Sequence, residues 1–129
     1  VAANVVASWT TAASAVMNVT TFKDVDPFDP FGTVATSAGS SGTTTVNVTA
    51  EVGDLVIDAT INETGSKTVG AGQTQIYNNG GANYYALGSY ELATGTTVTM
   101  SWNGTNNEWY QMGVALKPVR SYPKFLEMF

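Results

Sequence analysis

Two stretches of the chain, TVNVTA and GTTVTMSW, alternate apolar and polar side chains one by one. Successive side chains of a β-strand point to opposite faces of its sheet, so this pattern predicts strands with one dry and one wet face. A helix would need apolar residues at three-and-four spacing, which no long window of the chain shows. The dry face would carry Val46, Val48, Val98, Met100 and Trp102.

Turn-forming stretches rich in Gly, Asn, Asp and Pro separate the strand-like segments throughout the chain. Eight short strands of this kind are typical of two packed antiparallel sheets, so we expect an all-β, jelly-roll-like sandwich. The predicted strands cover residues 2–10, 14–22, 43–50, 53–61, 67–78, 83–93, 95–102 and 108–117. The rest of the predicted core is Leu55, Ile57, Ile61, Met112, Val114 and Leu116.

Length and composition narrow the class of protein. A chain of 129 residues is most simply one domain. Its net charge of -5 opposes contact with phosphate backbones, so we expect no nucleic-acid partner. Its apolar runs are too short to span a bilayer. A start at Val1 fits a mature exported product, so we expect an extracellular or cell-surface location.

Several stretches carry a resemblance to a known class of module: TTFKDVDPFDPFGT, GDLVIDAT, VGAGQTQIYN and TMSWNGTNNEWYQMGVALKP. Across residues 12–118 the chain resembles β-sandwich modules of secreted bacterial and phage-associated surface proteins, which are similar to jelly-roll and concanavalin-like sandwiches. The resemblance implies a structural or adhesive part of a larger extracellular object. It brings no catalytic motif.

The residue inventory also argues against catalysis. The chain has no His and no Cys, which excludes the common serine and cysteine triads and the usual zinc ligand sets. Its acidic residues are scattered along the chain, without the carboxylate pairing of a glycosidase. We therefore expect no enzyme activity and no cofactor, with calcium as the one open question.

That question rests on the stretch DVDPFDP, in which Asp24, Asp26 and Asp29 lie within six residues. Carboxylate oxygens this concentrated are the ligands that Ca²⁺ prefers. An Asp/Pro turn between strands is the alternative interpretation.

Aromatic residues gather in the second half of the chain. Exposed Tyr84, Tyr85 and Trp109 would be candidates for stacking against a sugar ring of a surface glycan. Alternation instead predicts that several of these rings belong to the core, with a polar tip at its rim.

Four Asn-x-Thr sequons occur, and each is a candidate for glycosylation. Asn and Thr two positions apart also lie on the same face of a strand, so a wet β-face produces the pattern without any sugar. The four residues are Asn18, Asn47, Asn62 and Asn103.

The chain ends are predicted to mediate assembly. Residues 1–11 would form a strand, either at the edge of its own domain or donated to a neighbour's open edge. Residues 12–117 would form the sandwich, and 118–129 an extended tail in which Pro discourages both helix and sheet. The candidate interface residues are Val5, Val6, Trp9, Arg120, Tyr122, Lys124, Phe125, Leu126, Met128 and Phe129.

An apolar tail must be buried against its own domain or against a neighbour, and its basic residues complement an acid-rich second copy. The sequence therefore predicts a non-catalytic extracellular subunit that self-assembles into a filament or surface layer. The alternatives are a glycan-binding adhesive module and a decoration or fibre protein of a virion.

Overall fold

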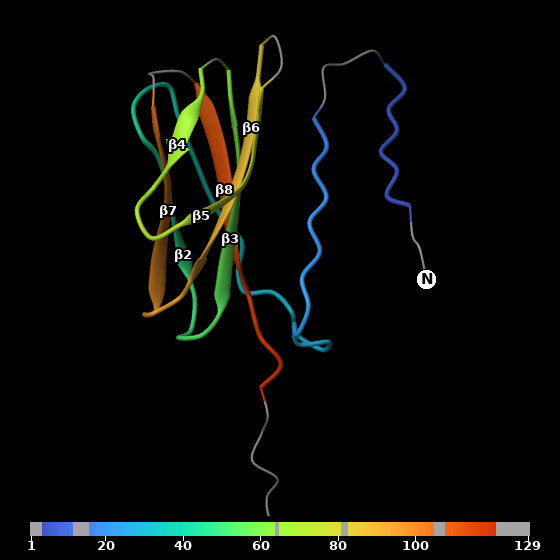
Figure 1. The fold of residues 1–129 in the computed structure, drawn as a ribbon, viewed down its shortest axis with the longest axis vertical. Coiled ribbons are helices and arrows are strands. Elements are labelled where there is room, and N and C mark those ends of the chain that lie inside the picture. Colours follow the sequence, from blue (N-terminus) through green and yellow to red (C-terminus); the bar gives the residue numbers. More distant parts are fainter. Residues whose placement is uncertain (1–3, 12–15, 64, 81–82, 105–107, 121–129) are drawn as a thin grey trace, which may run out of the picture.

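The computed structural model describes residues 4–11, 16–63, 65–80, 83–104 and 108–120. These residues form strands in two antiparallel sheets, which confirms the all-β sandwich (Figure 1). None of them lies in a helix long and apolar enough to cross a membrane. The strands are β1 (Ala35–Gly39), β2 (Thr44–Thr49), β3 (Leu55–Asn62), β4 (Lys67–Val69), β5 (Thr74–Gly80), β6 (Tyr85–Leu92), β7 (Thr97–Gly104) and β8 (Trp109–Leu116).

The five-stranded sheet has the order β1-β8-β3-β6-β5, and the three-stranded sheet has the order β2-β7-β4. Consecutive strands mostly lie in different sheets or are not neighbours, so the chain crosses repeatedly between the two layers. β3 is central in the larger sheet and pairs with β6 on one side and β8 on the other. The middle of that sheet is therefore built from segments distant in sequence.

Most predicted strands are confirmed, with two differences inside the sandwich. The predicted strand at 67–78 is two strands, because the chain turns at Gly72, whose φ of 84° favours glycine. β1 was not predicted, because its sequence ATSAG reads as turn chemistry. It nevertheless pairs along its length with β8.

The two N-terminal strand predictions are wrong for the residues that the structure describes. Residues 4–11 and 16–22, which we call the N-terminal arm, belong to no strand. Residues 16–22 run beside the five-stranded sheet, and residues 4–11 lie farther from it (Figure 1). The segment 16–22 faces side chains of the sheet rather than a free strand edge, so it forms no ladder.

The core predicted from TVNVTA and GTTVTMSW is confirmed. Side chains of β2 and β7 that point toward the five-stranded sheet are buried, and those between them are exposed. The opposing layer approaches closely at Gly113 of β8, where an added Cβ would lie 2.5 Å from a methyl carbon of Val48. The buried set comprises Val46, Val48, Val98, Met100 and Trp102.

Most of the other predicted core residues lie on the outward face of their strands rather than the inward one. Along β3 and β8, alternate residues face the other sheet, but these are Val56, Asp58 and Thr60, with Gln111 and Ala115 opposite. The apolar residues between them point outward, and the inward Asp58 and Gln111 can be buried because Gln111 Nε2 donates to Asp58 Oδ2. Leu116 is buried as predicted, whereas the following are only partly buried or exposed: Leu55, Ile57, Ile61, Met112 and Val114.

The Asp/Pro segment, which follows the arm, meets the start of the tail beyond the sandwich. Backbone N–H groups of Asp26 and Val119 donate to the carbonyls of Lys117 and Asp24, both at 2.9 Å. Isolated bridges join Val25 to Pro118 and Phe31 to Leu116. Residues 118 and 119, predicted to run free of the fold, are therefore paired with the Asp/Pro segment, and arm and tail leave the sandwich at the same end (Figure 1).

Candidate functional site

The outer face of the five-stranded sheet carries an apolar surface. On β3 and β8 the row of side chains that points away from the other sheet is apolar. In this row Ile61, Met112 and Tyr110 remain 43%, 48% and 55% exposed. These outward side chains are not part of the core between the two sheets.

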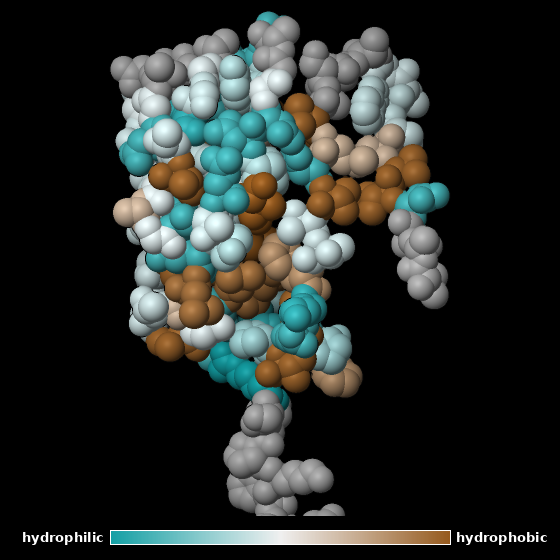
Figure 2. Space-filling view, viewed as in Figure 1, coloured by the Kyte–Doolittle hydropathy of each residue, from teal (hydrophilic) through white to brown (hydrophobic). Residues whose placement is uncertain are grey.

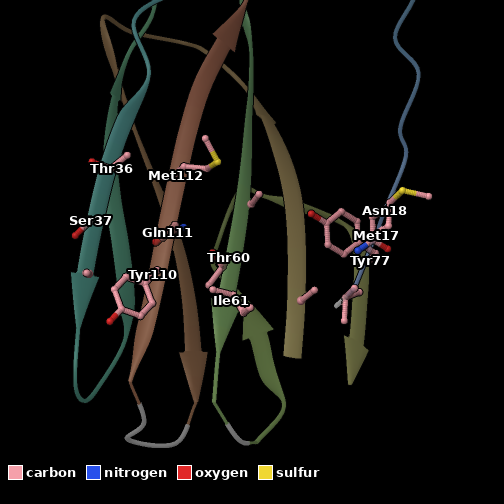
Figure 3. Close-up of a pocket in the computed structure, with 14 residues that line it drawn as sticks. Met17, Asn18, Thr36, Ser37, Thr60, Ile61, Tyr77, Tyr110, Gln111 and Met112 are labelled. Carbon is pink, nitrogen blue, oxygen red and sulfur yellow. The ribbon is translucent and has the colours of Figure 1, made fainter. Parts of the chain in front are cut away.

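A groove of about 840 Å³ lies on this face, bounded by the arm on one side and β1 on the other. Its floor comes from β3, β6 and β8, including Ala59, Ile61, Ala86 and Met112. Figure 3 shows Tyr77 and Met17 at the arm side, with Tyr110 and Met112 on the open part toward β1. None of the residues that line the groove is charged.

The arm segment 16–22 rests on the β5 side of the same face. Asn79 Nδ2 of β5 donates to Asn18 Oδ1 at 2.8 Å. Asn18, Thr20 and Phe22 line a second hollow, of about 290 Å³, with Ile57 and Val114 of the sheet. An extended apolar segment of this chain therefore already covers one half of the face, while the other half is open. Figure 2 shows hydrophobic side chains on both sides of the gap between arm and sandwich.

A buried polar network lies beneath this face, between the two sheets. Asp58 Oδ1 accepts from the backbone N–H and hydroxyl of Ser89, at 2.7 and 2.6 Å. Asp58 Oδ2 accepts from Trp102 Nε1 and Gln111 Nε2, both at 2.7 Å. The network continues through Gln73, which donates to Ser89 and accepts from Ser101. It joins β3, β6 and β8 to β7 across the sandwich.

Burial shifts the pKa values of ionisable side chains in and beside this network. It raises the pKa of Asp58 above its ordinary value, although hydrogen bonds from Ser89, Trp102 and Gln111 oppose the shift. Burial, and the negative charge of Asp58, raise the pKa of Tyr77 as well. Lys67, also buried, has its pKa lowered by loss of water. These groups stiffen the scaffold under the groove rather than line it, apart from Tyr77 and Gln111.

The Asp/Pro segment folds as a turn that is tied to the tail. Asp26 Oδ1 accepts from the backbone N–H groups of Phe28 and Asp29 at 2.8 and 3.2 Å, which lowers the pKa of Asp26. The Asp29 carboxylate pairs with Lys117. Among the described residues, no three acidic side chains, Asp24 included, cluster closely enough to hold a metal ion. Calcium binding here stays a prediction.

The predicted assembly residues fall into three groups. Val5, Val6 and Trp9 of the arm are exposed, Val6 at 81%. Arg120 forms ion pairs with Glu51 and Asp54 of its own β2–β3 turn, so its charge is used within the chain. The others lie outside the described residues: Tyr122, Lys124, Phe125, Leu126, Met128 and Phe129.

The aromatic candidates for sugar stacking are not alike. Trp109 is buried, and its Nε1 donates to the Ser41 carbonyl at 3.2 Å, so it presents no face to a sugar. Tyr85 is half-buried, and an added Cβ at Gly80 would lie 2.4 Å from its ring. Tyr84 is exposed and lines a hollow of about 260 Å³ with Tyr110, between the carboxylates of Glu63 and Glu108.

Three of the four sequon asparagines are accessible to differing degrees. Asn47 and Asn103 are exposed on the three-stranded sheet. Asn18 is half-buried, and its side chain accepts the hydrogen bond from Asn79 of β5. Asn62 is the last residue of β3. Its side chain is buried and donates to the Gly65 carbonyl at 2.9 Å, so a glycan does not fit there in the folded chain.

Sequence reasoning missed the outer face and the Asp58 network. The signal for the face was present in LVIDATI and WYQMGVAL, where one alternate row of side chains is apolar and the other contains Asp, Thr or Gln, but the apolar row was assigned to the core. A single Asp inside an apolar strand was the signal for the network, because a carboxylate in that position must be hydrogen-bonded.

No family model matches the chain, and no curated protein matches it. One solved structure that is similar to it is described as the tripod (BppUct-A-L) from the baseplate of bacteriophage Tuc2009. The two share 16% sequence identity with a TM-score of 0.41, over 86% of this chain and 83% of that one. The function proposed below is inferred from the surface of the chain itself.

Proposed function

We propose that this chain is a non-catalytic structural subunit that self-assembles outside the cell through its terminal segments. The assembly would be a filament or surface layer, with the fibre or decoration of a virion as the alternative setting. The observation that carries the proposal is the apolar outer face of the five-stranded sheet, half covered by the chain's own arm and half open.

An open face of this size needs a partner. Contiguous exposed apolar surface on a soluble monomer marks an interaction site or an aggregation liability. Burying a large apolar side chain fully contributes about 1.5–3 kcal/mol. Ile61, Tyr110 and Met112, together with Trp9 of the arm, are each about half exposed, so burying them would contribute part of the free energy of association, and further contacts along arm and groove would supply the rest.

The strand pairing supports the jelly-roll form of the sandwich. β1 pairs with β8, β2 with β7 and β3 with β6, so the chain resembles one long hairpin rolled into two sheets. Such a roll keeps the first and last strands together. Arm and tail leave the sandwich at the same end, but the arm then runs back along the sandwich, so residues 4–11 lie away from the tail (Figure 1).

Glycan binding is a second candidate, favoured by the hollow between Tyr84 and Tyr110. Its two exposed rings and the carboxylates of Glu63 and Glu108 match the stacking surface and hydrogen-bond acceptors that a sugar uses. The Tyr110 hydroxyl donates to Glu108, which fixes one ring in place. A titration with surface polysaccharides, using Tyr84→Ala as the control, tests this role.

Truncation tests the assembly. We expect the full chain to form oligomers by sedimentation velocity and regular particles in negative stain, and the chain lacking residues 1–11 or 121–129 to form smaller species. Both cuts spare the eight strands and the Arg120 ion pairs, so circular dichroism should show unchanged β content. Monodisperse monomer from all three chains would overturn the proposal.

A further inference from the structure

The groove on the outer face can accommodate one extended peptide segment. Residues 16–22, an extended apolar segment of this same chain, lie along its β5 side. On its open side, β1, β8 and β3 leave Tyr110, Met112 and Ile61 exposed. Because the face already binds one extended segment of this sequence, a second such segment is the occupant that its chemistry fits best.

Residues 4–10 have the side-chain pattern of that occupant. In an extended chain, Val5, Ala7 and Trp9 share one side, while Asn4, Val6, Ser8 and Thr10 share the other. The first side is wholly apolar and can face the groove, and the second, polar apart from Val6, can face water. In the structure the first side is not buried, since Trp9 is 55% exposed.

Charge distinguishes the arm from the tail. Residues 1–22 contain no charged side chain, and the groove lining contains none either. The tail carries Lys124 and Glu127 within its apolar stretch. Placing either charge in an uncharged groove would cost desolvation with no partner to offset it. The groove therefore favours the arm.

Position favours the arm of another molecule. The chain's own residues 4–11 lie farther from the sandwich than residues 16–22, and away from the open half of the face (Figure 1). We propose that the open half of the groove, over Ala59, Ile61 and Met112, binds residues 4–11 of a second copy. This inference rests on the proposed function and names its interface.

An interface of this kind joins two different surfaces, the arm of one subunit and the groove of the next. Such a heterologous contact leaves a free arm at one end and a free groove at the other, so it propagates into a chain of subunits unless its rotation closes a ring. The arm then acts as the linker between successive sandwiches.

Disulfide trapping tests the inference, because the native chain has no cysteine. An Ala7→Cys chain bearing a mass tag is mixed with an untagged Met112→Cys chain under mild oxidation, and the mixed dimer is measured by intact mass. Since only thiols held close together pair efficiently, we expect about tenfold more mixed dimer than with a Thr99→Cys partner. Thr99 is exposed on the three-stranded sheet and is the matched control.

Using two singly substituted chains excludes a bond within one molecule. If the chain associates but Ala7→Cys pairs with Met112→Cys no better than with Thr99→Cys, the interface named here is wrong while self-assembly stands. Preferential pairing of Phe125→Cys with Met112→Cys would assign the groove to the tail and also overturn the inference. A chain that stays monomeric in sedimentation would remove both proposals together.

Discussion

At the scale of single residues, the sandwich depends on one buried carboxylate. Asp58 accepts four hydrogen bonds, two at each oxygen, from Ser89, Trp102 and Gln111. Its partners come from both sheets, so it fixes their relative position as well as their stability. Networks of this kind are costly to leave half satisfied.

The substitution Asp58→Asn tests this role. Whichever way the amide is turned, its NH₂ group faces at least one N–H donor, so at least one hydrogen bond is lost and we expect the free energy of unfolding to fall by about 1–3 kcal/mol. Urea unfolding followed by circular dichroism measures the loss. The control is Asn47→Asp on the exposed face of β2, which should change stability little. Equal stability of the Asp58→Asn chain and the native chain would contradict the role given to the network.

The effect of Asp58→Asn on the free energy of unfolding should also depend on pH, with a sign that follows from the raised pKa of Asp58. Burial raises the pKa of Asp58 in the folded chain above its ordinary 3.8, so the folded state holds this proton more tightly. The contribution of Asp58 to stability is then fully present below pH 3.8 and is lost as pH rises through the folded pKa. The stability difference between native and Asp58→Asn chains should therefore shrink as pH rises.

At the scale of elements, the sequence predicted strands better than it predicted their faces. β2 and β7 alternate cleanly, because each has one buried and one wet side, and their core residues were correct. In β3 and β8 the more apolar row of side chains faces outward, so the local pattern indicates the wrong inward face. The face is decided by Asp58 and Gln111, whose partners lie on other strands and cannot be read from either segment alone.

The arm and the candidate site illustrate the same limit. The sequence indicated an apolar N-terminal segment that could leave its domain, and its exposure in the structure agrees with that. It did not predict a groove, since the groove arises where β1, β3, β6 and β8 meet the arm. β1 was itself missed, because a strand of ATSAG forms through its pairing with β8 rather than through its own propensity.

The contact between the tail and the β2–β3 turn leads to a prediction at this scale. Arg120 pairs with Glu51 and with Asp54, which is only 2% exposed. Arg120→Met should lower the free energy of unfolding slightly, and the loss should be smaller in 1 M salt, because exposed ion pairs are screened. Thermal unfolding at low and high salt measures this, with Lys23→Met, also at an exposed position, as the control. A loss that does not change with salt would mean that packing, not charge, holds the tail.

At the scale of the whole molecule, the fold separates a two-sheet body from an exposed arm. The sandwich has a buried core and an internal polar network, whereas many of the exposed apolar groups lie on one outer face and on the arm. Such a division would suit the proposed building block, in which the body keeps its shape while the arm and the groove of a neighbour form the joint.

The most direct test of this account is the mass of the intact chain in solution as a function of concentration. Sedimentation velocity across the micromolar range should show species larger than a monomer that grow with concentration, and the replacement Met112→Lys at the centre of the groove should return the chain to monomer with unchanged β content. A single monomeric species at every concentration, in both chains, would contradict the claim that the outer face is a joint between subunits.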